Sequence, residues 1–220
     1  MSSTFKPLSQ QAFETKIDEG AVLFDARPAE EFLDTFIPGA VFIGPLESNW
    51  EIATSFFDKK TPLIFILPAK KEKIDFANSD SYNIQGYLDG GYDNYIHVKK
   101  EIDLLIEIEA DEFAMDIPFD ASMLILDVRD PEVFEKEHVK NALNIPLLDM
   151  GDIALIADFE DDQNIYIYGE DEVQGIMAAS LIKRQGYSNL RHVKGGWQQI
   201  KKETSIAFKK ASKNPDDQTK

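Results

Sequence analysis

The feature that most constrains the fold is an internal repeat with a nearly constant spacing of 102 residues. Residues 21–32 and 123–134 each carry an apolar run followed by Asp-x-Arg and a phenylalanine. The same register relates three further pairs of segments, the last with a spacing of 105: 36–43 and 138–145, 63–66 and 165–168, and 90–91 and 195–196. A chance match would not hold its register through four segments, so we predict two homologous domains.

Each copy alternates short apolar runs with helical patterns. Strands are predicted at residues 21–25, 41–43 and 63–66, and a helical turn at 28–32 begins near a proline. In the second copy, residues 173–185 have helical apolar spacing and Gly186 follows as a cap. Continuous apolar strands separated by helices predict an α/β fold, in which each domain is a mostly parallel twisted sheet with helices on both faces.

The repeat and the charge pattern set the expected boundaries. The first domain is assigned to residues 5–98 and the core of the second to 121–208, with a polar tail at 209–220 that we expect to be disordered. Residues 99–120 contain eight acidic residues and no basic one between Glu101 and Asp120. A calcium site is conceivable there, but the spacing lacks the glycine and the ligand alternation of a calcium loop. We interpret 99–120 as a solvated acidic linker with one helical turn.

The formal net charge of −17 makes nucleic acid and anionic membranes poor partners. The first residues do not resemble a secretion signal, and no apolar run approaches the ~20 residues that span a bilayer, so a cytoplasmic protein is expected. The chain has three scattered histidines, His97, His138 and His192, and no cysteine. We therefore expect neither a metal site nor a cofactor.

The ordered segments together resemble the rhodanese-like (sulfurtransferase) family. Asp-x-Arg after an apolar strand, a turn ending in Phe32 or Phe134, and the run at 37–43 are similar to its opening, and residues 186–197 to its closing segment. The first copy more closely resembles rhodanese-like domains that follow a metallo-β-lactamase-type hydrolase, on residues 27–32, Asn49-Trp50 and 86–91. No histidine-rich metal motif of such a hydrolase is present in the sequence.

In this family the strand before the active loop ends in a catalytic cysteine, on which the backbone N–H groups of the loop converge. The resemblance places that position at Leu67 in the first copy and at Gly169 in the second. Because a thiolate is the nucleophile of cysteine-based transfer, both nucleophile positions are vestigial and no catalytic residue is predicted.

The two loops differ in charge. The second contains Glu170, Asp171, Glu172, Gln174 and Gly175, and we expect the acidic side chains to cap the following helix and fill the loop, with binding of a cation or a basic partner as the alternative.

The first loop carries Lys70, Lys71 and Lys73, which could receive a small anion or serve only solubility. Pro68 removes one N–H group from that loop.

The remaining candidates are given structural roles. Asp25 with Arg27, and Asp127 with Arg129, lie two residues apart at strand ends, so we expect each pair to make a contact that holds its loop. His138 matches a histidine common in the family and is also expected to be structural.

These residues favour a catalytically inactive tandem rhodanese-like protein, a binding or regulatory module in sulfur or persulfide metabolism with a protein partner that handles sulfur. The alternative is an enzyme that presents a sulfur substrate to a partner's thiol, or that uses an acidic residue with His138 as acid and base. A cysteine phosphatase, which shares the scaffold, is excluded because Gly169–Gly175 holds neither cysteine nor arginine.

Overall fold

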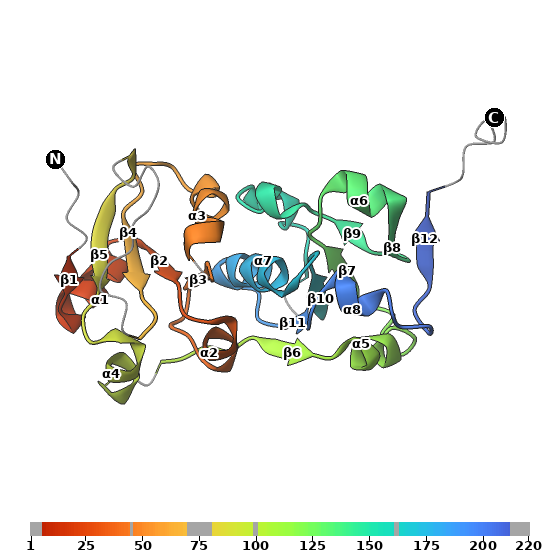
Figure 1. Cartoon of the computed structure of the whole chain (residues 1–220), viewed down its shortest axis with the longest axis horizontal. Helices are drawn as coiled ribbons and strands as arrows, with labels where there is room; N and C mark the ends of the chain where they lie inside the picture. The colour runs from red at the N-terminus through yellow and green to blue at the C-terminus, as the bar shows by residue number, and fades with distance from the viewer. Residues whose placement is uncertain (1–5, 45, 70–80, 99–100, 161–162, 212–220) are drawn as a thin grey trace.

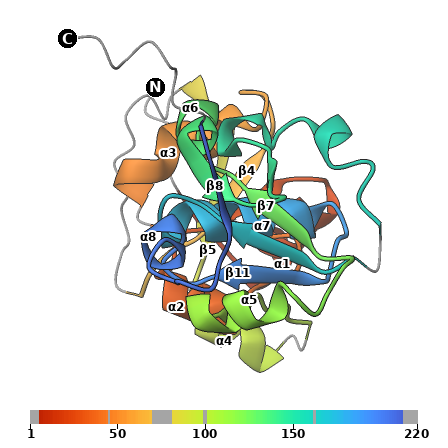
Figure 2. The same ribbon diagram turned by 90° about the vertical axis from the view of Figure 1, so that its right-hand side faces the viewer.

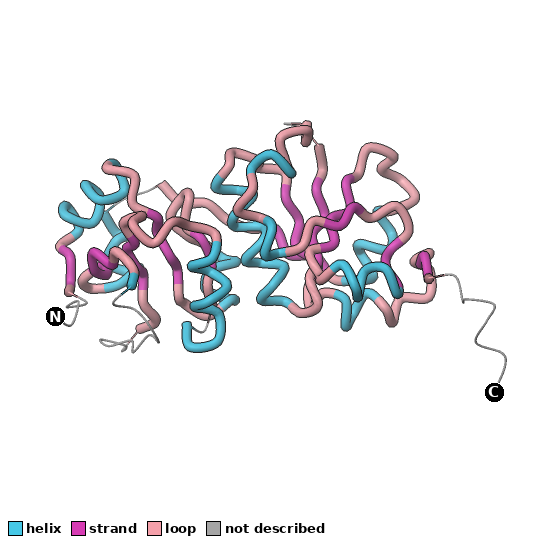
Figure 3. Tube along the Cα trace, turned by 90° about the horizontal axis from the view of Figure 1, so that it is seen from above, coloured by secondary structure: helices cyan, strands magenta, loops and turns pink. Residues whose placement is uncertain are grey.

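The computed structural model describes residues 6–44, 46–69, 81–98, 101–160 and 163–211. It contains two α/β domains that lie side by side along the long axis of the molecule (Figures 1 and 3). Figure 2 shows α2, α4 and α5 on one side of the sheets, and α3 and α6 on the other. The expected fold class is confirmed.

The first domain is a five-stranded sheet in the order β1-β5-β4-β2-β3, and every neighbouring pair is parallel. Its strands are β1 (Pro7–Leu8), β2 (Val22–Asp25), β3 (Val41–Phe42), β4 (Leu63–Ile66) and β5 (Ile84–Leu88). Its helices are α1 (Gln10–Asp18), α2 (Ala29–Asp34), α3 (Leu46–Ser55) and α4 (Gly91–Val98). The central strands β2 and β4 are buried at every position, as their uninterrupted apolar runs predict.

The second domain repeats this topology in the order β6-β11-β10-β7-β9. Its strands are β6 (Ile106–Ile108), β7 (Leu124–Asp127), β9 (Leu143–Asn144), β10 (Ile165–Tyr168) and β11 (Leu190–Val193), and β8 (Glu137–Val139) pairs antiparallel with β12 (Phe208–Lys210). Its helices are α5 (Ala110–Asp116), α6 (Pro131–Lys136), α7 (Glu172–Arg184) and α8 (Trp197–Ile200), with short 3-10 helices at η2 (Leu147–Asp149) and η3 (Ile153–Leu155). The repeat inferred from the sequence therefore corresponds to two copies of one sheet order.

The segment expected to be a solvated linker is largely part of the second domain. β6 is an edge strand paired with β11, and α5 buries Phe113 in the second core. Residues 101–105 lead into β6, and Phe36 and Asp103 pair there through their backbones. The acidic composition misled the prediction, because a few buried apolar residues, Leu105, Ala110, Phe113 and Ala114, are enough to anchor this segment to the fold despite its many carboxylates. Lys209 and Lys210, expected in a disordered tail, belong to β12.

Helix α7 joins the two domains. It begins at the loop after β10, and its later residues contact the first domain: the Ser180 hydroxyl accepts a hydrogen bond from the Phe42 N–H at 3.0 Å, and Arg184 donates to the Gly39 carbonyl at 2.8 Å. Lys183 forms an ion pair with Asp103 at 2.7 Å. The main cluster of buried apolar residues includes side chains from both domains, so the two sheets share a continuous core across α7.

Candidate functional site

Each domain carries a buried Asp–Arg pair at the carboxyl end of its second strand. Arg27 donates to Asp25 through Nε at 3.0 Å and Nη2 at 2.7 Å, and Arg129 donates to Asp127 at the same two distances. In each pair the arginine Nη2 also donates to a backbone carbonyl eight residues later, that of Thr35 for Arg27 and that of Glu137 for Arg129. The expected contact is present in both copies, where it ties the strand end to the loop that follows the next helix.

An aromatic ring covers each arginine. The guanidinium carbon of Arg27 lies 3.6 Å from the ring centroid of Tyr92, and that of Arg129 lies 4.0 Å from the centroid of Trp197. Both rings follow the Gly-Gly pair of their copy. Tyr92 was not among the predicted site residues, although its alignment with Trp197 could have identified it.

In the second domain the loop after β10 is closed by a side chain of its own. The Glu170 N–H donates to the Gln174 side-chain oxygen at 2.9 Å. A Cβ atom built on Gly169 would lie 2.5 Å from the Gln174 Cβ, closer than such atoms approach one another. Gly169 therefore stands where the resemblance places a cysteine, and Gln174 occupies the space that a side chain there would need.

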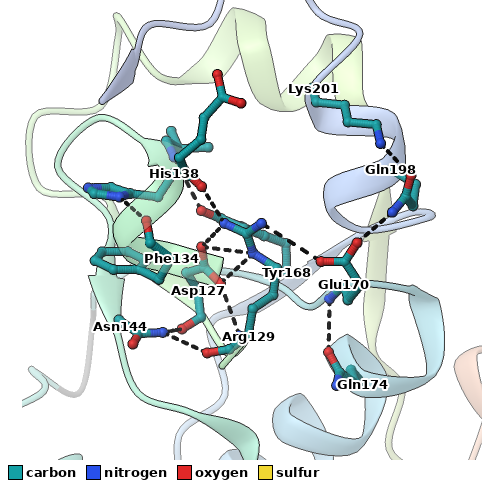
Figure 4. Close-up of polar contacts among 12 residues, drawn as sticks. Asp127, Arg129, Phe134, His138, Asn144, Tyr168, Glu170, Gln174, Gln198 and Lys201 are labelled. Atoms are coloured by element: carbon teal, nitrogen blue, oxygen red, sulfur yellow. Dashed lines mark hydrogen bonds and ion pairs between the residues drawn. The ribbon is translucent and has the colours of Figure 1, made fainter. Parts of the chain in front are cut away.

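Two of the three acidic residues of this loop, Asp171 and Glu170, have different roles. Asp171 is the N-cap of α7 and accepts a hydrogen bond from the Gln174 N–H at 3.0 Å, as expected. Glu170 instead turns back over the site, with Oε2 3.8 Å from Arg129 Nη1 and Oε1 accepting from Gln198 (Figure 4). Lys201 in turn donates to Gln198. Glu170 and Gln174, rather than the whole acidic set, close the second site.

Among the residues that the structure describes, none fills the corresponding site in the first domain. A cavity of about 400 Å³ is lined by Arg27, Leu67, Pro68, Asp89, Tyr92 and Asp93, among others. Leu67 lies at the end of β4 and is 6% exposed. Lys70, Lys71 and Lys73, predicted as an anion-binding loop, lie outside the described residues.

His138 lies apart from the acidic loop. Its Nδ1 is 2.6 Å from the Phe134 carbonyl oxygen, and its ring stacks on Phe134 at 3.7 Å between centroids. Figure 4 shows the imidazole beside Phe134, on the opposite side of Arg129 from Glu170. The structure does not bring His138 together with a loop carboxylate as an acid–base pair.

A second histidine, His192, was not among the candidate site residues predicted from the sequence. His192 on β11 is fully buried under Gly175, where a Cβ atom would lie 2.7 Å from the imidazole Nε2. Its Nδ1 lies 3.7 Å from the Glu107 carboxylate, which also pairs with Lys194 at 3.2 Å. His192 and Lys194 hold the pKa of Glu107 below its usual value. The large sequence separation between β6 and β11 hides this contact in the sequence, because the two strands meet only in the sheet.

We expect Glu107→Gln to reduce the dependence of stability on acidity. A lowered carboxylate pKa stabilises the fold above the usual pKa of the group, and this contribution is lost as the pH falls through the folded-state value. The unfolding free energy of the wild type should therefore fall more steeply below about pH 5 than that of the variant. Urea unfolding across the acidic range measures this, with Glu132→Gln on the exposed start of α6 as control. Equal slopes for wild type and Glu107→Gln would contradict the expectation.

Within the described ranges, no group of three or more histidine, cysteine, aspartate or glutamate side chains is arranged to hold a metal ion. In the same part of the chain no helix combines the length and the apolar composition that crossing a membrane requires.

Comparison with known proteins gives one result that covers most of the chain. The profile of the rhodanese-like domain matches twice, at residues 9–97 and 109–203. Among curated relatives, YrkF of Bacillus subtilis, which carries the name of a candidate sulfur carrier protein, is 31% identical over 101 residues, covering 46% of this chain and 53% of the relative. The thiosulfate sulfurtransferase PspE of Escherichia coli is 28% identical over 79 residues, covering 36% and 76%.

The chain covers only about half of the first two curated relatives, 53% of YrkF and 56% of the uncharacterized protein YqhL of Bacillus subtilis. Among solved structures, the rhodanese-like domain of the Anabaena protein Alr3790 matches with a TM-score of 0.45 and 23% identity, over 50% of this chain and 83% of that chain.

Proposed function

The chain belongs to the rhodanese-like domain family, and we propose that it is a catalytically inactive member that acts as a binding or regulatory module in sulfur metabolism. The observation that carries this proposal is the state of the two nucleophile positions. Leu67 and Gly169 directly follow the equivalent strands β4 and β10, and neither offers a group that could accept a sulfur atom. The names of YrkF and PspE support the connection with sulfur chemistry.

The closed second site also supports a loss of sulfur transfer, because more than the missing sulfur atom separates it from a working active site. Gln174 accepts the loop N–H group of Glu170, and Glu170 itself lies against Arg129. A sulfur-bearing anion entering this loop would have to displace both side chains. Such a loop is suited to a structural or docking role rather than to turnover.

The proposal is tested by the transfer of sulfur from thiosulfate to cyanide. We expect the purified chain to produce thiocyanate no faster than the buffer, because no side chain can carry the persulfide intermediate. A cysteine-bearing sulfurtransferase at the same concentration serves as the positive control. Clear turnover by this chain would overturn the proposal.

A second candidate is favoured by the open cavity beside Leu67, in which the chain could hold a sulfur substrate for a partner's thiol. In that case, adding the chain to a cysteine-bearing sulfurtransferase would raise its rate at limiting thiosulfate. An unchanged rate would remove this candidate and leave the inactive module.

The proposal also includes a relation of the first copy to rhodanese-like domains fused to metallo-β-lactamase-type hydrolases, a sulfur-handling protein partner, and a cytoplasmic location. Asn49 and Trp50 carry part of this relation: Asn49 donates to the Ile43 carbonyl at 2.9 Å and Trp50 is buried.

Affinity capture from the source cell tests the partner, with a variant altered at Gly169–Gly175 as control. If a partner is captured by the wild type and not by the loop variant, the loop is the binding site. If both capture the partner equally, the loop has only a structural role.

A further inference from the structure

The two domains offer an internal comparison that bears on what the open cavity binds. Strands β2 and β4 pair in the same register as β7 and β10, so Leu67 corresponds to Gly169 and Pro68 to Glu170. Both domains have the Asp–Arg pair and an aromatic ring over the arginine, Tyr92 in the first and Trp197 in the second. The second domain therefore shows which chemical groups lie beside the arginine when the side chains of the domain itself occupy such a site.

In the second domain a carboxylate lies beside the arginine. Glu170 Oε2 is 3.8 Å from Arg129 Nη1, on the side of the guanidinium that Asp127 does not occupy. In the first domain Pro68 stands at that position and has no charged group. Among the described residues, Arg27 forms its ion pair with Asp25 alone, and its side chain lines the cavity. The place that a carboxylate takes in the second domain holds no carboxylate of the described residues in the first.

A second observation comes from Tyr92, which is 5% exposed and lines the same cavity. Thr35 and Arg27 lie near its hydroxyl, yet the hydroxyl completes no hydrogen bond with the described residues. A buried hydroxyl without a partner is uncommon, because leaving it unpaired costs free energy. A ligand with a hydrogen-bonding group would satisfy it.

The rim of the cavity is negatively charged and therefore favours a positively charged group. Three exposed carboxylates, Glu31, Asp89 and Asp93, line it, while Arg27 is already neutralised by Asp25. A purely anionic ligand would be repelled at this rim, and an ammonium group would be attracted. The floor is the apolar side chain of Leu67, which suits a short aliphatic or thiol-bearing side chain.

We propose that the cavity of the first domain binds a zwitterionic α-amino acid, with its carboxylate beside Arg27, its ammonium group toward the carboxylate rim and its side chain over Leu67. The proposal rests on the proposed function, in which this domain binds without transferring, and it names the class of ligand. A cavity of about 400 Å³ is large enough for a molecule of this size.

The experiment is titration calorimetry of the full chain with L-cysteine as the probe, compared with two molecules that each lack one charge. Cysteamine lacks the carboxylate, and 3-mercaptopropionate lacks the ammonium group. We expect L-cysteine to bind once per chain, and each truncated molecule to bind at least about tenfold more weakly, because each loses a charge-assisted contact. Absence of saturable binding of L-cysteine would overturn the proposal. If either truncated molecule bound as tightly as L-cysteine, the claim that the cavity recognises both charges would be wrong.

Two variants locate the site. Pro68→Glu places a carboxylate where Glu170 lies in the second domain, so it should weaken the binding of L-cysteine by at least about tenfold while preserving the Arg27–Asp25 pair. Pro38→Glu makes the same change at an exposed proline outside the cavity and should bind as the wild type does. The double variant Asp89→Asn/Asp93→Asn should weaken the binding of L-cysteine but not that of 3-mercaptopropionate, which has no ammonium group for the rim carboxylates to attract. Unchanged binding by Pro68→Glu, confirmed as folded by circular dichroism, would place the ligand elsewhere and overturn the assignment.

The two proposals can fail separately. Thiosulfate turnover would overturn the inactive module whether or not L-cysteine binds. Failure of L-cysteine to bind would remove the ligand assignment and leave the absence of turnover as it stands.

Discussion

Replacing Asp127 with alanine is expected to lower the unfolding free energy by about 3–5 kcal/mol, a large share of the ~5–15 kcal/mol that stabilises a typical protein. The carboxylate is fully buried and accepts from Arg129 through Nε, Nη2 and the backbone N–H. Without it, a guanidinium that is 1% exposed keeps its charge in the core, and its remaining counterion is the more distant Glu170 carboxylate at 3.8 Å. Chemical unfolding monitored by tryptophan fluorescence measures the loss, because Trp197 covers this arginine.

The cause can be separated from simple loss of packing. Asp127→Ala/Arg129→Met removes the unpaired charge along with its partner, so it should recover much of the stability that Asp127→Ala alone loses. Glu132→Ala, on the exposed start of α6, should change stability by less than about 0.5 kcal/mol. If Asp127→Ala stayed within about 1 kcal/mol of the wild type, the pair would not hold the loop as inferred.

Cysteines placed at the two equivalent strand ends should react very differently. Because the chain has no other thiol, Ellman's reagent reports only the introduced one. Gly169→Cys places its Cβ 2.5 Å from the Gln174 Cβ, so we expect a loss of stability of about 1–3 kcal/mol and slow labelling. Leu67→Cys puts a smaller side chain at the wall of an open cavity and should be labelled at least about tenfold faster.

Two further variants show whether Gln174 is responsible. Gly169→Cys/Gln174→Gly removes the side chain that fills the loop, so labelling should approach that of Leu67→Cys. Ser188→Cys, at an exposed position after α7, gives the rate of an unhindered thiol. Labelling of Gly169→Cys as fast as that of Ser188→Cys would show that the second site is open.

The sequence predicted the Asp–Arg contacts because both partners lie within three residues at a strand end, where local geometry decides the contact. It also predicted that Asp171 could cap α7. It did not predict the different contacts of Glu170 and Asp171, because the charge of a residue does not show which neighbour it meets. Glu170 meets Arg129 and Gln198, which come from other elements of the fold.

The linker was the largest error in the domain organisation. Eight carboxylates between Glu101 and Asp120 favoured a solvated segment, yet Leu105 and Phe113 are buried and β6 completes the second sheet. β6 has only three residues, too few for alternating hydrophobicity to outweigh the charge count. Its pairing with β11 depends on a strand about 85 residues later in the chain.

The amino-acid sequence by itself determined the two-domain α/β fold, the family, and the absence of a thiol at both strand ends, because repeats, apolar runs and residue identities are properties of the chain. Only the tertiary structure decided that the two vestigial sites differ. Gln174 and Glu170 close the second site, whereas Pro68 leaves Arg27 facing a cavity in the first. Whether a site is open depends on side chains packed against one another from several elements, and that packing is set by the sheet rather than by the order of residues.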